Sequence, residues 1–168
     1  RGFKSETNAL LGINQNLIYI AIRRPHKPPT AGTEVFDVGL RSGSSSDAKT
    51  NSSILADMTF VLRKDSSSEY NGISSRLTGE YTLKLNNSSS HTAGWMDSAT
   101  PWAHMTGASI NGSNGAANTG NLVDYSFKRA PGFFDVVAYR SVTTTTYADI
   151  PHNLGVQPEL VIIKSRDN

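Results

Sequence analysis

The sequence of 168 residues contains no cysteine, which excludes disulfide bonds, thiolate metal sites and cysteine nucleophiles. Charge is also scarce, because only 18% of the residues are charged, whereas soluble domains carry roughly 25%. The 16 lysines and arginines are scattered and the formal net charge is +2, so the sequence offers no basic track for nucleic acid. No apolar run approaches the roughly 20 residues that a membrane-spanning helix requires. The composition therefore argues against nucleic-acid binding and membrane insertion.

The sequence begins Arg1-Gly2-Phe3, with neither an initiator methionine nor the apolar stretch of a secretory signal. We therefore expect the chain to be an excerpt of a longer protein. Serine, threonine, asparagine and glycine replace the missing charged residues, while 37% of the residues are hydrophobic. The chain can thus build a core beneath a polar surface of low charge.

Apolar residues occur in short runs that are typical of β-strands. Residues 17–22 form a nearly continuous apolar run that fits a strand buried on both faces better than a helix. Similar runs occupy residues 34–40, 58–62, 133–139 and 160–163. Residues 81–85 alternate as a half-exposed strand does, and loops rich in serine, glycine and asparagine separate the runs. The pattern predicts an all-β sandwich or barrel without helices.

Three segments recur in the same order along the chain. NLIYIAIRR at residues 16–24 matches NLVDYSFKR at residues 121–129, 105 residues later. Phe-Asp-Val recurs after 98 residues, from residues 36–38 to residues 134–136. DMTFVLRKD at 57–65 resembles ELVIIKSRD at 159–167, 102 residues later. The matches predict a tandem repeat of about 100 residues, a length that suits a sandwich of seven to nine strands.

The repeat predicts where the units begin and end. Residues 1–24 would close a preceding unit, residues 25–150 would form one β-sandwich unit, and residues 151–168 would be a linker and the first strand of the next unit. A linker is expected near the two prolines at Pro151 and Pro158. In an alternative arrangement, the terminal strands pair within one compact sandwich.

Two longer motifs carry a family resemblance. These are FKRAPGFFDVV at residues 127–137 and IPHNLGVQPELVIIKSR at residues 150–166, preceded by YIAIRRP at residues 19–25 and GTEVF at residues 32–36. They resemble a domain that recurs in large structural proteins of marine tailed phages, cyanophages among them. The resemblance implies an antiparallel β-sandwich of the jelly-roll or concanavalin-like kind in a tail fibre or particle-surface protein. The family has no catalytic residues to carry over to this chain.

Both long motifs also have a structural explanation that requires no ligand. Pro131 and Gly132 can reverse the chain between two strands, and the phenylalanines that follow supply apolar area. In the second motif, Asn153 or Gly155 can adopt a positive φ in a turn. His152 has no second histidine or carboxylate at metal-ligand spacing, so we interpret it as structural.

Basic pairs end two of the matching segments, Arg23-Arg24 and Lys128-Arg129. Charged side chains at such places solvate a strand end, blunt a sheet edge or pair with a neighbouring subunit. The alternative is a site for phosphate or a sulfated glycan, because guanidinium groups bind such anions with two hydrogen bonds.

The candidate binding surface is the segment of residues 88–118. Its chemistry-bearing residues are His91, Trp95, Asp97, Trp102 and His104, and both tryptophans of the chain are among them. Indole rings stack on sugars, while Asp, Asn and His can bond to hydroxyl groups, so the composition suits weak glycan recognition. In the alternative interpretation, the tryptophans pack beneath the loop or against another subunit. No spaced acidic motif supports a metal site, and no cofactor is expected.

Catalytic motifs are missing from the sequence. The acids available for catalysis, Asp65, Glu69, Glu80 and Asp97, are separated by ordinary loop sequence, and no nucleophile elbow, zinc motif or phosphate-binding loop is present. We therefore expect a protein that is not an enzyme. The alternative is a fragment of a tailspike depolymerase, which would cleave polysaccharide with paired carboxylates.

The expected function is that of a virion structural protein in a tail fibre or surface fibre. Its partners would be other virion subunits and further copies of itself, with a trimer expected from the family analogy alone. Host-surface glycan is the expected external ligand, bound through the segment of residues 88–118. Many weak contacts in an oligomer would combine into firm attachment.

Overall fold

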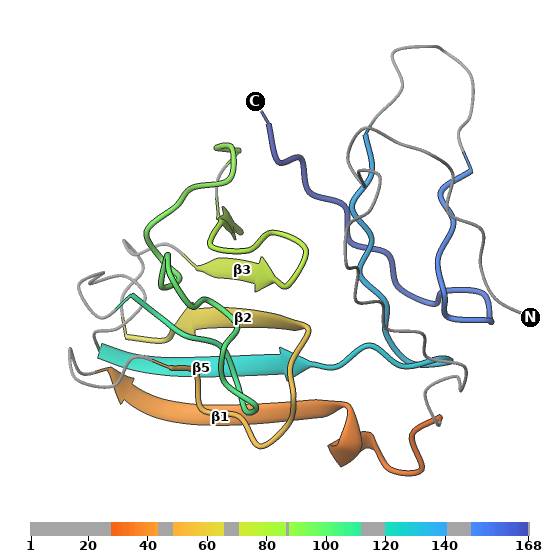
Figure 1. Cartoon of the computed structure of the whole chain (residues 1–168), viewed down its shortest axis with the longest axis horizontal. Coiled ribbons are helices and arrows are strands. Elements are labelled where there is room, and N and C mark those ends of the chain that lie inside the picture. Colours follow the sequence, from red (N-terminus) through yellow and green to blue (C-terminus); the bar gives the residue numbers. More distant parts are fainter. Residues whose placement is uncertain are drawn as a thin grey trace, which may run out of the picture.

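The computed structural model describes residues 28–43, 49–65, 71–86, 88–111, 120–140 and 149–167, which fold around one five-stranded antiparallel sheet. The strands are β1 (Phe36–Gly43), β2 (Met58–Arg63), β3 (Gly72–Ser75), β4 (Thr82–Lys84) and β5 (Gly120–Phe127). Their order across the sheet is β1-β5-β2-β3-β4 (Figure 1). A 3-10 turn, η1 (Gly32–Glu34), is the only helical element in these ranges. None of the helices described there could cross a membrane.

The all-β prediction is confirmed for these residues, and most of the expected strands are present. The runs at 34–40, 58–62 and 81–85 overlap β1, β2 and β4, and the segment at 121–129 overlaps β5. The runs at 133–139 and 160–163 are described but form no strand. An apolar run becomes a strand only where a neighbour offers unpaired backbone groups, and among the described residues these two runs pair only through the isolated bridge of Phe134 to Ala130. The run at 17–22 and the preceding unit at 1–24 lie outside the described residues.

The two faces of the sheet differ in chemistry. Strand β5 places Leu122, Asp124 and Ser126 on one face, so its alternate residues lie on the other. The register places Val38 and Phe60 on either side of Tyr125. The second face is therefore lined by apolar residues from every strand. We call it the open face, and the face that contains Asp124 the covered face.

The covered face packs against the irregular segments at residues 49–56 and 88–111, which Figure 1 shows crossing in front of the strands. Isolated bridges join Lys49 to Ser109 and Met96 to Ile110. The buried core between these segments and the sheet consists of Val61, Trp95, Met96, Ala108, Ile110 and Leu122. The main core of the described residues thus lies on one side of the sheet.

The open face carries a group of aromatic rings but is incompletely covered. The ring of Phe127 lies 5.0 Å from Phe36, 5.6 Å from Phe60 and 5.1 Å from Phe134. Farther along β1, Val38 is 45% exposed and Leu40 is 64% exposed. A second sheet against this face, as a sandwich requires, is not seen among the described residues, so the sandwich remains a proposal.

One ion pair is buried within the covered face. The Nε atom of Arg41 donates to Asp124 Oδ2 over 2.7 Å, and the backbone N–H of Asn51 donates to the same oxygen over 2.9 Å. Asp124 has no exposed surface, and Arg41 is 9% exposed. Because both charges are removed from water, their pairing ties β1, β5 and the segment after β1 together.

Gly39 lies where β1 passes very close to the covering segment. A Cβ atom at this position would overlap the backbone carbonyl of Asn51. We expect Gly39→Ala to lower the free energy of unfolding by about 1–3 kcal/mol, because backbone must move to admit the methyl group. Urea unfolding would measure this. Gly32→Ala is the control, since its Cβ would meet open space, and equal stability of both variants would contradict the close approach.

Candidate functional site

The segment at residues 88–111 lies across the covered face and holds all five candidate ligand-binding residues. Trp95 is 5% exposed and belongs to the core. Its ring packs onto Gly72, where a Cβ atom would lie only 2.5 Å from Trp95 Cζ3. The structure therefore places Trp95 where its indole offers no accessible face for a sugar ring.

Trp102 is only partly buried at the margin of the same core. Its Nε1 donates to the Gly79 carbonyl over 3.1 Å. The guanidinium of Arg76 lies 5.2 Å from the ring centroid, and Arg76 Nη1 donates to the Trp102 carbonyl over 3.3 Å. The cation–π contact occupies part of the ring, so only the rest of the indole is open to a ligand.

His91 forms a partly exposed cluster with two residues that the sequence analysis did not include. Its ring lies 4.4 Å from the Tyr81 ring. The backbone of His91 donates to the Arg166 carbonyl over 2.9 Å, and Arg166 Nε donates to His91 Nδ1 over 3.3 Å. Tyr81 is 37% exposed, which leaves aromatic surface beside a cation and an imidazole. The half-exposed alternation at residues 81–85 was the available signal for Tyr81.

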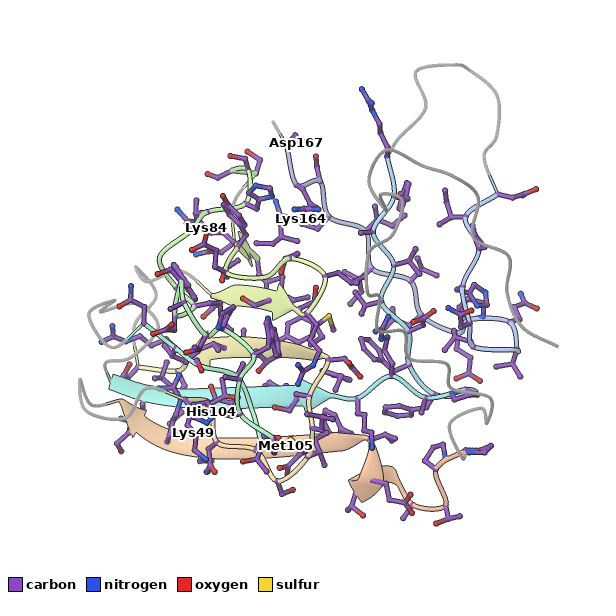
Figure 2. The ribbon with its side chains drawn as sticks, in the orientation of Figure 1. Lys49, Lys84, His104, Met105, Lys164 and Asp167 are labelled. Carbon is purple, nitrogen blue, oxygen red and sulfur yellow. The ribbon has the colours of Figure 1, made fainter. Side chains whose placement is uncertain are left out.

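Asp97 and His104 have different surroundings again. Asp97 Oδ1 accepts hydrogen bonds from the backbone N–H groups of Ala99 at 2.9 Å and Thr100 at 2.7 Å. These bonds hold the pKa of the Asp97 carboxyl below its ordinary value, the Thr100 bond contributing most. His104 is exposed next to Met105, which is 76% exposed. Figure 2 shows this pair on the side of the sheet formed by β1 and β5.

Trp95 and Trp102 share the core and its margin, whereas among the described residues no hydrogen bond or ring contact joins His91, Asp97 or His104 to them or to one another. Trp95 is in the core, Trp102 contacts Arg76, His91 contacts Tyr81, and Asp97 closes its own turn. The contacts bring His91 together with Tyr81 and Arg166, and they do not gather the five into one surface. Glycan binding stays a prediction. The aromatic surface accessible to a glycan in this segment and beside it is the ring of Tyr81 and part of the ring of Trp102.

The two long motifs meet in space, which their sequence separation did not predict. Gly132 N–H donates to the Leu154 carbonyl over 2.7 Å, and Asn153 N–H donates to Asp135 Oδ2 over 2.8 Å. Gly132 and Gly155 have φ values of +73° and +74°, as turn glycines do. The structural explanation of both motifs as turns agrees with these contacts.

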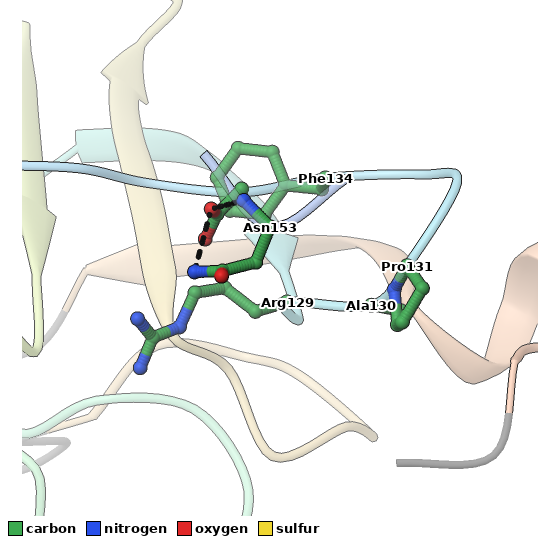
Figure 3. Close-up of a pocket in the computed structure, with 6 residues that line it drawn as sticks. Arg129, Ala130, Pro131, Phe134 and Asn153 are labelled. Carbon is green, nitrogen blue, oxygen red and sulfur yellow. Dashed lines mark hydrogen bonds between the residues drawn. The ribbon is translucent and has the colours of Figure 1, made fainter. Parts of the chain in front are cut away.

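An open hollow of about 220 Å³ lies where the motifs meet (Figure 3). It is lined by Arg129, Ala130, Pro131, Phe134, Asp135 and Asn153. Arg129 is turned toward an acidic partner, because its Nε lies 3.9 Å from Asp57 Oδ1 and its backbone N–H donates to Asp57 Oδ2 over 2.7 Å. The nearby carboxylate disfavours phosphate or sulfate at Arg129. The other basic pair, Arg23-Arg24, lies outside the described residues.

Two of the acids considered for catalysis, Asp65 and Asp97, accept hydrogen bonds from loop backbone. Asp65 accepts hydrogen bonds from Arg63 Nε at 2.8 Å and from Asn121 N–H at 2.7 Å. These bonds, the Arg63 bond first, hold the pKa of Asp65 below its ordinary value, so this carboxyl is ionised at neutral pH and unsuited to act as a general acid. Glu69 lies outside the described residues. Among the residues that the structure describes, no three or more metal-ligating side chains lie close enough together to hold a metal ion.

Asp37 makes stability depend on pH. Hydrogen bonds from the Ser53 backbone and hydroxyl lower the pKa of Asp37, so its contribution is present above about pH 4 and is lost as pH falls through the folded-state value. We expect Asp37→Asn to destabilise the chain at pH 7 by less than about 1 kcal/mol, because solvent screens this site. Urea unfolding from pH 7 to pH 2.5 should show the two proteins converging, and a constant difference would contradict the assignment.

Comparison with known proteins does not identify a relative. The chain matches no protein-family model, no curated protein and no solved structure. Inferences about function therefore rest on its own residues and geometry.

Proposed function

We propose that the chain is a structural unit of a phage particle appendage, a tail fibre or virion surface fibre, which assembles with other virion subunits. The assembly part of the proposal is carried by the apolar surface left uncovered, and the phage appendage rests on the motif resemblance at residues 127–137 and 150–166. On the open face of β1, Val38 is 45% exposed and the next residue on that face, Leu40, is 64% exposed. Contiguous apolar surface of this kind is uncommon in soluble monomers and marks interaction sites.

The proposed unit has the physical properties that an assembly block needs. A hydrogen-bonded antiparallel sheet, fixed on one side by a packed core and a buried ion pair, gives a rigid frame. The apolar residues on the other side gain stability when a neighbouring subunit covers them. The low charge of the sequence limits repulsion between closely packed subunits.

Host attachment is the second part of the proposal. Tyr81 and Trp102 offer aromatic surface, and His91 adds an imidazole beside Tyr81. Asp97 and His104 add polar groups elsewhere in the same segment. Each such contact with a host glycan would be weak. Several subunits in one fibre would raise the overall affinity without any new contact.

Immunogold electron microscopy on particles of the phage that encodes the chain would test the structural role. Antibody raised against the full chain should label an appendage in a regular pattern. Absence of label from intact particles, with label on infected-cell debris, would contradict the proposal.

A glycan array with the full chain would test the attachment role. We expect binding that Tyr81→Ala or Trp102→Ala weakens, whereas Phe133→Ala, an exposed aromatic residue outside the proposed contact, leaves it unchanged. Binding that survives both changes would place the glycan elsewhere. A chain on the appendage that binds no glycan would leave assembly as its role.

A further inference from the structure

Three adjacent strands of the sheet, β1, β5 and β2, each have a sequence counterpart elsewhere in the chain. In the structure, β5 lies between β1 and β2 and pairs with both. Residues 16–24 match residues 121–129, which contain most of β5, residues 134–136 match the start of β1, and residues 159–167 match the segment containing β2. The chain thus contains a second set of three similar sequence segments.

The described counterparts are held by the same hydrogen bonds as the originals. In β1, Asp37 accepts from its neighbour Val38 N–H at 2.9 Å and from Ser53 N–H, which lies five residues before β2. Asp135 accepts from its neighbour Val136 N–H at 3.0 Å and from Asn153 N–H at 2.8 Å. The aspartate therefore ties the first element to the approach of the second element in both sets.

The two described counterparts have no strand between them. Residues 135–140 and 156–164 are assigned to no strand or bridge. Val137 is 40% exposed, Tyr139 is 49% exposed, and residues 160–163 are more exposed still. We call residues 134–139 together with residues 160–163 the acceptor surface. Its two parts correspond to the strands that flank β5 in the sheet.

We propose that the acceptor surface binds residues 16–24 of the same chain as a central strand, which completes a second three-stranded sheet. The known register fixes the expected pairing, because Tyr125 lies between Val38 and Phe60. The equivalent residues are Ile20, Val136 and Ile162, all of them apolar. Ile20 lies between the other two in the completed sheet.

Two residues that contact each other in the first set both differ in the second set, which supports this arrangement. Arg41 of β1 and Asp124 of β5 form the buried ion pair of the first set. Their counterparts are Tyr139 and Tyr19, so both charges are replaced together by aromatic residues. A single buried charge would be costly, whereas two tyrosines can pack against each other. Such a joint replacement is expected if residues 16–24 pair with residues 134–139.

The connection to β1 favours a strand from the same chain. Arg24 corresponds to Arg129, which follows the end of β5, and the last residue of β5 pairs with Phe36. Phe134 is the counterpart of Phe36, so the C-terminal end of residues 16–24 is expected near Phe134. Phe134 and Phe36 both contact the Phe127 ring, at 5.1 Å and 5.0 Å. The chain from Arg24 to Phe36 can span roughly 40 Å, which is ample for two ends on either side of one ring.

Cysteine cross-linking in the full chain tests the proposal, and the natural absence of cysteine makes the result specific. Ile20→Cys with Val136→Cys, and Ile20→Cys with Ile162→Cys, should each form a disulfide within a monomer under mild oxidation. Opposed Cα atoms in antiparallel strands lie about 4.5–5.5 Å apart, within disulfide range. Tyr19→Cys with Val136→Cys is the control and should cross-link far less, because a shift of one residue turns the side chain to the other face.

Hydrogen exchange on the unaltered chain gives an independent test. Amides in residues 16–24 and in both parts of the acceptor surface should exchange at least about a hundred-fold more slowly than in an unfolded chain. Rapid exchange throughout residues 16–24 would overturn the proposal, as would equal cross-linking of the control pair. Disulfides formed only between chains would overturn the same-chain assignment and show that the surface accepts a strand from a second molecule.

Discussion

Replacing Asp124 with alanine should destabilise the protein by about 3–5 kcal/mol, the largest loss that we expect from a single change. The substitution leaves Arg41, which is 9% exposed, as a buried cation without its carboxylate partner. It also removes the acceptor of the Asn51 N–H group. Urea unfolding monitored by tryptophan fluorescence would measure the effect, since Trp95 is part of the adjoining core.

The double variant Arg41→Met with Asp124→Leu distinguishes two causes of destabilisation. One is the loss of the attraction within the ion pair, and the other is the cost of leaving one buried charge unpaired. It should be clearly more stable than Asp124→Ala alone, because neither charge then remains in the core. A loss below about 1 kcal/mol for Asp124→Ala would show that Arg41 finds water or another partner, and that the pair is not buried in solution.

Trp95→Ala should lower the free energy of unfolding by about 3–5 kcal/mol, because truncation leaves a large cavity between the sheet and the covering segment. Trp95 packs with Met96, Ile110 and Leu122 in the core, and its ring fills the space above Gly72. Thermal and urea unfolding would give the size of the loss.

Trp102→Ala is the matched control, since Trp102 is only partly buried and contacts Arg76 at the margin of the core. Its effect on stability should be clearly smaller than that of Trp95→Ala. A Trp95→Ala variant with unchanged stability would contradict the core position, and loss of glycan binding by that stable variant would return Trp95 to the binding surface.

Most of the sheet could be predicted from the alternation and length of its apolar runs, but one strand could not. Strands β1, β2, β4 and β5 each contain several apolar or β-branched residues. Strand β3 has the sequence Gly-Ile-Ser-Ser, in which Ile73 is the only large apolar residue. It is a strand because β2 and β4 hold it on both sides. The β-propensity of these four residues does not predict such pairing, because the pairing depends on the neighbouring strands.

The candidate site was less predictable than the fold. The turn roles of Gly132 and Gly155 followed from residue type, and both have positive φ. Trp95 and Trp102 lie in similar loop sequence, so burial of one and partial exposure of the other depends on which strand passes beneath them. The contact of Arg166 with His91 joins residues 75 positions apart and has no local signal.

The position of β5 also determines when the sheet can close. Strands β1 and β2 are separated in the sheet by β5, although β5 follows both of them in the chain. During synthesis the chain emerges at about 5–20 residues per second, so a gap of strand width persists for several seconds after β2 has appeared. Pairing over such sequence distances is also intrinsically slow. Until β5 has been made, the facing edges of β1 and β2 are therefore open to pairing with another strand, including the β5 segment of a second copy of the chain.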